Sequence, residues 1–256
     1  MTPVDLAFEC HGQPSGCPLL ILHGFLASSR NWRSVAGKLS VQQHVYVLDM
    51  RNHGSSPHAE TMDYPLMAAD ILAFMDNLGQ QKAHLLGHSM GGKVAMWFAM
   101  HYPHRVEKLV VVDIAPVNYN HSFDSLILAL KNLPLQHLMH RKHAEQLLAE
   151  HIPELGFRQF LLQNLLLNDG QYYWRINLDI IQKNAHYIVG FPEHGAKRYE
   201  RSALFIAGQH SNYIQMEKVL ALFPQAEYVA IPRTGHWLYV EAPDAFSKIV
   251  LDWLHA

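Results

Sequence analysis

The sequence is poor in cysteine, has little net charge and has no long apolar run, and each lack excludes a class of protein. Its 256 residues include only two cysteines, Cys10 and Cys17, which excludes a disulfide scaffold and predicts a reducing compartment, the cytoplasm. The formal net charge is −2 and no basic stripe occurs, so we expect no nucleic-acid partner. No stretch reaches the roughly eighteen apolar residues that a membrane-spanning helix needs. The first residues also lack the basic and apolar segments of a signal peptide.

Histidine is abundant, with 19 residues, and a metal site would need several of them at ligand spacing. The pairs His101/His104 and His140/His143 are each three residues apart, but neither has an obvious third ligand. The sequence therefore predicts no metal site and no cofactor.

Short apolar runs alternate with segments of helical periodicity at both ends of the chain. Continuous apolar runs indicate strands buried on both faces, and their alternation with helices predicts a mostly parallel sheet with helices on both faces, an α/β fold. We expect strands over 18–22, 44–48, 82–86, 109–112, 203–207 and 227–231, a weak edge strand over 4–9, and helices over 31–39, 67–78, 92–100, 217–222 and 243–254.

This alternation stops between residues 117 and 199, where no buried strand is evident. We expect an all-helical lid with helices over 126–133, 144–152, 157–167 and 178–187, inserted into a core of residues 1–116 and 200–256. Ligands bind at the carboxyl ends of strands in open α/β sheets, so the lid should cover that edge. Aromatic residues are dense in the lid, and Phe157 and Tyr172 are predicted to line a substrate pocket.

The motif Gly87-His88-Ser89-Met90-Gly91 lies between an expected strand and an expected helix. A G-x-S-x-G sequence in this context is typical of a sharp turn that exposes a nucleophilic serine. The glycines remove the Cβ atoms that would clash in such a turn. Ser89 is therefore the predicted nucleophile, and the Met90 N–H should point into the same space.

A serine nucleophile needs a base, and the base needs an acid to orient it. His236 lies on a loop after the last expected strand and is the best candidate base. In enzymes that carry a G-x-S-x-G serine on such a sheet, the acid usually follows the strand after the lid. Here that loop is 208–212, which contains no Asp or Glu, and Glu217 falls inside the next helix. Asp113 ends the neighbouring strand, and we therefore predict a triad of Ser89, Asp113 and His236.

Acyl transfer also needs donors for a developing oxyanion. The Met90 N–H is one, and the loop His23-Gly24-Phe25-Leu26 should supply the other, with Phe25 preferred to Leu26. Leu26, His88 and Trp237 adjoin these groups in the sequence and are predicted to contact substrate.

Five blocks of sequence span nearly the whole chain: His23-Gly24, Asp49-Met50-Arg51-Asn52-His53-Gly54, Gly87–Lys93, Asp113-Ile114-Ala115-Pro116-Val117 and Gly235-His236-Trp237. Together these blocks resemble α/β-hydrolases, and more narrowly the bacterial esterases of that fold. The resemblance implies a carboxylesterase with thioesterase activity, including on acyl-CoA, and a triad acid after the sixth strand.

Other functions remain open on the same fold. A C–C bond hydrolase or a cofactor-free peroxidase would use the same residue types, and a non-catalytic module could bind a small molecule without turning it over. Dehalogenases and epoxide hydrolases are disfavoured, since they carry Asp where Ser89 stands. The leading prediction is a serine hydrolase of small-molecule esters or thioesters.

Overall fold

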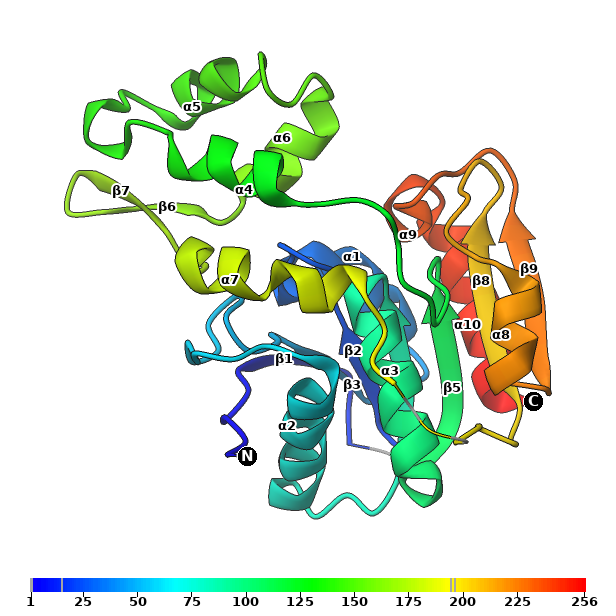
Figure 1. Ribbon diagram of the computed structural model, residues 1–256. Coiled ribbons are helices and arrows are strands. Elements are labelled where there is room, and N and C mark those ends of the chain that lie inside the picture. Colours follow the sequence, from blue (N-terminus) through cyan, green and yellow to red (C-terminus); the bar gives the residue numbers. More distant parts are fainter. Residues whose placement is uncertain (1, 15, 194, 196) are drawn as a thin grey trace.

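A seven-stranded sheet runs through the centre of the protein in this computed structural model, which describes residues 2–14, 16–193, 195 and 197–256 (Figure 1). The strand order is β1-β3-β2-β4-β5-β8-β9, and every pair is parallel except β1 with β3. The expected α/β class with a mostly parallel sheet is confirmed. The strands are β1 Phe8–His11, β2 Leu19–Leu22, β3 Val45–Leu48, β4 Ala83–His88, β5 Val106–Val112, β8 Ala203–Gly208 and β9 Ala226–Ile231.

Helices cover both faces of this sheet. The helices α2 Tyr64–Asn77, α3 Met90–His101 and α8 Met216–Leu222 pack on one face, and α1 Arg33–Leu39, α9 Leu238–Glu241 and α10 Pro243–His255 pack on the other. Successive residues of β2 face opposite layers: Leu20 and Leu22 join the first core, and Leu19 and Ile21 join the second. Alternate residues of a strand point to opposite faces, which is why a strand covered on both sides is apolar throughout.

The edge strand lies later in the chain than expected. Residues 4–9 were the expected range, but β1 is Phe8–His11 and pairs antiparallel with β3, Phe8 opposite Leu48. Its alternation of exposed and half-buried residues is the pattern of a sheet edge, and this weak pattern carries little information about where the strand begins.

A large insertion lies between β5 and β8 and contains α4 Asp124–Lys131, α5 Arg141–Leu148, α6 Leu155–Leu162 and α7 Leu178–Val189. The expectation that it is all helical is wrong, because β6 Leu165–Asn168 and β7 Gln171–Trp174 form an antiparallel hairpin. The turn of this hairpin is Asp169-Gly170, both at positive φ. Asp-Gly is a strong hairpin signal. The helix that was expected over 157–167 ends at Leu162, before this hairpin begins.

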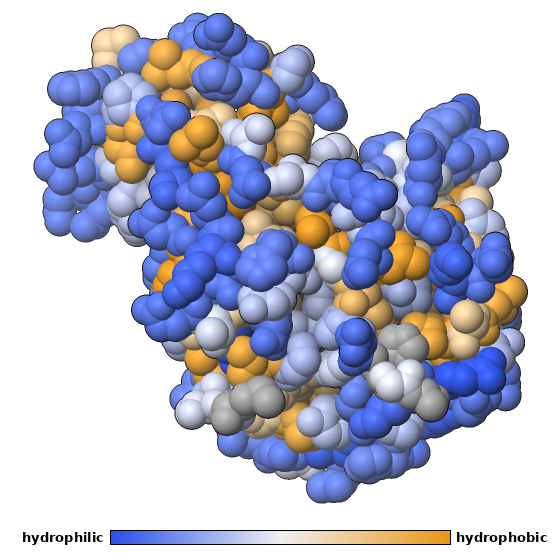
Figure 2. Space-filling model, in the orientation of Figure 1, coloured by the Kyte–Doolittle hydropathy of each residue, from blue (hydrophilic) through white to orange (hydrophobic). Residues whose placement is uncertain are grey.

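The insertion has an apolar core of its own and lies over the upper end of the sheet, drawn in green and yellow-green in Figure 1. In Figure 2 the outline of the molecule is notched between the insertion and the loops above β8 and β9. The boundaries 117–199 remain a prediction, and residues 194 and 196 of that range lie outside the described part. Among the described residues, no helix combines the length and the apolar character needed to cross a bilayer.

Candidate active site

Ser89 occupies the turn between β4 and α3 with φ 52° and ψ −117°, a strained backbone for a residue with a side chain. A Cβ on Gly87 would lie 2.1 Å from the Gly91 carbonyl oxygen, and a Cβ on Gly91 would lie 2.2 Å from the Leu22 carbonyl oxygen. The turn therefore admits only glycine at both positions. Ser89 is half-buried, whereas His88 and Met90 on either side of it are buried.

Asp113 and His236 are in direct contact. The Nδ1 atom of His236 lies 2.7 Å from Oδ2 of Asp113, whose side chain is fully buried, and the His236 side chain is 21% exposed. Asp113 follows β5 at φ 52°, and its Oδ1 accepts the Gly208 N–H at 3.2 Å. A carboxylate bound to Nδ1 leaves Nε2 as the free ring nitrogen, the arrangement that a general base needs.

The loop 208–212 contributes a hydroxyl to this pair. Ser211 donates from Oγ to Asp113 Oδ2 at 2.5 Å. Glu217, the nearest carboxylate after this loop, is exposed on α8. The sequence predicted no role for Ser211, because only an Asp or Glu was expected to serve as the acid in this loop.

The His88 side chain packs against the His236 ring and binds its backbone carbonyl. Its Nε2–H donates to the His236 carbonyl oxygen at 2.9 Å, and the two ring centroids are 4.6 Å apart. Tyr213 packs on His236 at 4.4 Å. Burial holds the pKa of His88 well below its usual range, and the residue is 3% exposed. This placement does not support the expected contact of His88 with substrate, because the side chain supports the loop of His236 instead.

His88, the residue before Ser89, binds the His236 carbonyl and so brings Ser89 near His236. Within the described chain, no hydrogen bond joins the Ser89 hydroxyl to the His236 ring. Such contacts are often long without substrate and tighten when it binds. A surface pocket of about 450 Å³ reaches His236, with polar groups of Tyr119, His121 and Asn212 in its wall. Within the described residues, the active site included, no group of three or more His, Cys, Asp or Glu side chains could hold a metal ion.

The loop after β2 presents the Phe25 N–H as its free donor. The Leu26 N–H is already bound to His53 Nε2 at 3.1 Å, which argues against Leu26 as the donor. Among the described residues, neither the Phe25 N–H nor the Met90 N–H has a hydrogen-bond partner. The Leu26 side chain is 1% exposed and packs in the core of the insertion, so its placement does not support a contact with substrate.

Two buried histidines hold this loop. His23 accepts the Met50 N–H at Nε2, 3.0 Å, and donates from Nδ1 to the Gly24 carbonyl at 2.8 Å. His53 donates from Nδ1 to the Arg51 carbonyl at 3.0 Å and accepts from Leu26 at Nε2. Burial lowers the pKa of both rings, that of His53 to about 3, and each ring is therefore neutral at neutral pH. His53 belongs to the motif 49–54, but the motif alone predicted no role for its side chain.

The rest of that motif, 49–54, is structural. The Asp49 carboxylate accepts the N–H groups of Ser29 at 2.7 Å and Ser55 at 2.8 Å. Gly54 has φ +56°, and a Cβ there would lie 2.0 Å from Asp49 Cγ. Arg51 forms a buried two-bond contact with Asp70 at 2.7 and 2.6 Å. These contacts fix the loop that carries His53.

The two predicted lid residues have different surroundings. The Phe157 ring lies 5.4 Å from that of Trp237, the residue after His236, and Phe160 lies 6.0 Å from it. Tyr172 lies on β7, where it packs against the core of the insertion. The structure therefore brings Phe157 and Trp237 together beside His236, and it places Tyr172 within the insertion itself.

Comparison with known proteins agrees with this geometry. The family described as alpha/beta hydrolase fold matches residues 18–243. The chain belongs to the α/β-hydrolase family. It is 34% identical to esterase YbfF of Escherichia coli, with 97% of each chain covered. A solved structure of a marine microorganism esterase superposes with a TM-score of 0.93 at 38% identity, covering 98% of this chain and 99% of that one.

A zebrafish relative (Danio rerio) is named sn-1-specific diacylglycerol lipase ABHD11. It is 37% identical, and the match covers 99% of this chain and 83% of the relative. Relatives named esterase and lipase along the full length of the chain support an ester hydrolase that acts on small molecules.

Proposed function

We propose that this protein is a serine carboxylesterase that works through an acyl-enzyme on Ser89. His236 takes the proton of the Ser89 hydroxyl as its oxygen attacks the ester carbonyl, and Asp113 orients and stabilises the charged ring. The Phe25 and Met90 N–H groups receive the oxyanion. The observation that carries the proposal is the 2.7 Å contact of His236 Nδ1 with the fully buried Asp113. The strained Ser89 lies beside this pair, because its N–H donates to the carbonyl of Val112, the residue before Asp113, at 3.0 Å.

The acyl-enzyme is then hydrolysed. His236 has by then given the first proton to the leaving alcohol, whose departure forms the acyl-enzyme. It now takes a proton from a water molecule as that water attacks the acyl carbon, and it returns this proton to Ser89 Oγ as the bond to the acyl group breaks and the acid is released. A thiol is a better leaving group than an alcohol, so the same residues would cleave a thioester such as an acyl-CoA. The free thiols of Cys10 and Cys17 support a reducing, cytoplasmic location.

The test uses p-nitrophenyl esters and acyl-CoAs of increasing chain length, with wild type and Ser89→Ala. We expect ester turnover by wild type and a loss of roughly a millionfold in Ser89→Ala, whose fold is retained. A variant with a tenth of the wild-type rate would exclude the serine mechanism. Wild type that binds these compounds without turning them over would instead indicate a binding module.

The vertebrate relatives favour one further substrate for the same site. Several are named sn-1-specific diacylglycerol lipases, at 36 to 37% identity. A diacylglycerol in mixed micelles is therefore the second substrate to assay, and release of the sn-1 fatty acid is the expected product.

A further inference from the structure

A side chain of the insertion binds the loop that carries Phe25. Asn164, which follows α6, donates from Nδ2 to the Leu26 carbonyl oxygen at 2.7 Å and to the Leu161 carbonyl oxygen at 3.3 Å. Asn164 is 2% exposed. Burying a primary amide is unfavourable unless it forms hydrogen bonds, and the shorter bond of Asn164 is the one that leaves the insertion.

Two peptide groups and one backbone hydrogen bond connect the Asn164–Leu26 hydrogen bond to the Phe25 N–H. The Leu26 carbonyl shares a peptide group with the Ala27 N–H, which donates to the Gly24 carbonyl at 3.1 Å. The Gly24 carbonyl shares a peptide group with the Phe25 N–H. A trans peptide is planar, and its C=O and N–H point in opposite directions. When Asn164 fixes the Leu26 carbonyl, the direction of the Ala27 N–H is therefore fixed as well. When the Ala27 N–H in turn fixes the Gly24 carbonyl, the direction of the Phe25 N–H is fixed.

We propose that Asn164 is a positioning residue of the oxyanion hole, which aims the Phe25 N–H by holding the peptide groups of residues 24–27. The inference rests on the proposed function, because the Phe25 N–H stabilises an oxyanion only in an enzyme that forms a tetrahedral intermediate. Hydrogen bonds in a chain polarise one another, so Asn164 also makes the Phe25 N–H a stronger donor. The insertion then contributes to transition-state stabilisation as well as covering the site.

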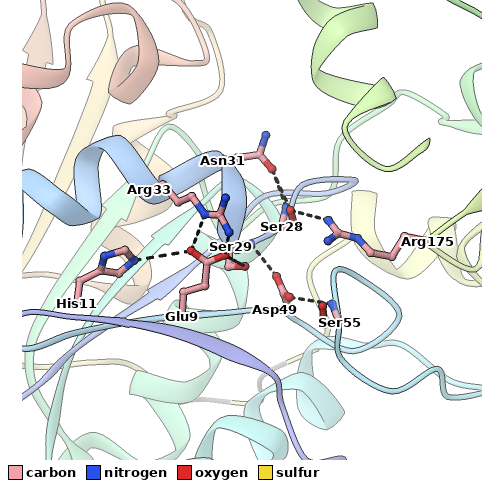
Figure 3. A network of polar contacts seen from close by, with 9 residues as sticks. All are labelled: Glu9, His11, Ser28, Ser29, Asn31, Arg33, Asp49, Ser55 and Arg175. Carbon is pink, nitrogen blue, oxygen red and sulfur yellow. Dashed lines mark hydrogen bonds and ion pairs between the residues drawn. The ribbon is translucent and has the colours of Figure 1, made fainter. Parts of the chain in front are cut away.

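Neighbouring contacts keep Asn164 in place. The Arg175 N–H donates to the Asn164 carbonyl at 2.9 Å, and Arg175 Nη2 donates to Ser28 Oγ at 3.0 Å. Figure 3 shows Arg175 reaching from the insertion to Ser28, close to Asp49. Gln163 accepts from Asn31 Nδ2 at 2.8 Å. This bond joins the same segment to the core without touching residues 24–27, which makes Gln163 a matched control.

The test compares Asn164→Leu with Gln163→Leu on p-nitrophenyl acetate, whose acyl group is too short to need the lid. In Asn164→Leu we expect kcat to fall about tenfold with KM within about twofold of wild type, because the contact acts on the transition state. Gln163→Leu should keep the wild-type kcat. Affinity for a trifluoromethyl ketone, which forms a tetrahedral oxyanion adduct with Ser89, should fall in Asn164→Leu by the same factor as kcat/KM.

A second measurement does not depend on turnover. Amide hydrogen exchange of residues 23–28 should be faster in Asn164→Leu than in wild type or Gln163→Leu, and Asn164→Ala replaces the first variant if that one does not fold. Wild-type kcat with unchanged exchange would overturn the inference, and so would a fall in kcat with unchanged ketone affinity. If wild type hydrolyses no ester, the proposed function fails, and the exchange rates alone decide whether Asn164 holds the loop.

Discussion

Ser211 and His236 bind the same oxygen of Asp113. The Ser211 hydroxyl lies 2.5 Å from Oδ2, and His236 Nδ1 lies 2.7 Å from it. The Gly208 N–H binds the other oxygen at 3.2 Å. The carboxylate is thus fixed by the loop after β8, although its own residue follows β5. A loop without a carboxylate therefore still helps to orient the histidine.

Asp113→Asn should lower kcat by roughly two to four powers of ten with the fold retained. The substitution keeps the shape of the side chain, but an amide can favour the wrong tautomer of His236. The measurement is steady-state kinetics on a p-nitrophenyl ester. Glu217→Gln is the control and should keep the wild-type kcat, since Glu217 is exposed on α8. Wild-type kcat in Asp113→Asn together with an inactive Glu217→Gln would assign the acid to Glu217 instead.

Ser211→Ala should lower kcat by about tenfold, because a hydrogen bond to a charged group contributes about 1.5 kcal/mol. Ser211→Thr retains the hydroxyl and should keep most of the rate. Kinetics of both variants, at equal folded fraction by circular dichroism, provide the measurement. Equal losses in the two variants would attribute the effect to packing in the loop and not to the hydroxyl.

The fold and the Asp113–His236 contact could be predicted because both depend on where strands end. Apolar runs reveal strands buried on both faces, and parallel strands bring their carboxyl ends to one edge of the sheet. Asp113 ends one such strand, and His236 follows another. The absence of a carboxylate in the loop 208–212 then left Asp113 as the acid, and the structure places it against His236.

Other features depend on side-chain contacts between distant residues, which no local sequence pattern predicts. Asn164 binds Leu26 across 138 positions, and Ser211 binds Asp113 across 98. A single polar side chain has no periodicity, so neither contact could be predicted. The hairpin was not predicted for another reason: the leucines before Asp169-Gly170 also fit the periodicity of a helix, and short apolar runs do not distinguish a helix from a strand.

Phe157→Ala should shift the preferred acyl length while leaving acetyl ester turnover within about threefold of wild type. The motivation is the Phe157–Trp237 contact beside His236, which brings the insertion to the site. The measurement is kcat/KM across p-nitrophenyl esters of two to twelve or so carbons, where each buried methylene is worth about 0.8 kcal/mol. Tyr173→Ala is the control, because Tyr173 is 43% exposed on the hairpin. An unchanged profile in Phe157→Ala would place the acyl group elsewhere.

His53→Gln should weaken the loss of stability on acidification. Burial lowers the pKa of folded His53 to about 3, whereas an unfolded histidine titrates near 6.5. Between these values the unfolded chain binds a proton that the folded protein excludes, so stability falls as the pH falls, by about 1.4 kcal/mol per pH unit. Above about pH 6.5 neither state is protonated there, and the contribution is constant.

Urea unfolding at pH 7 and pH 5 measures this effect. The wild-type loss between the two pH values should exceed that of His53→Gln by about 2 kcal/mol, which is the integral of one proton over the window. Glutamine can still accept the Leu26 N–H, so the loop should remain closed at pH 7. His137→Gln changes an exposed histidine and should keep the wild-type pH dependence. Equal losses in wild type and His53→Gln would mean that His53 takes up its proton in the folded state, and His53 could then no longer accept the Leu26 N–H at acidic pH.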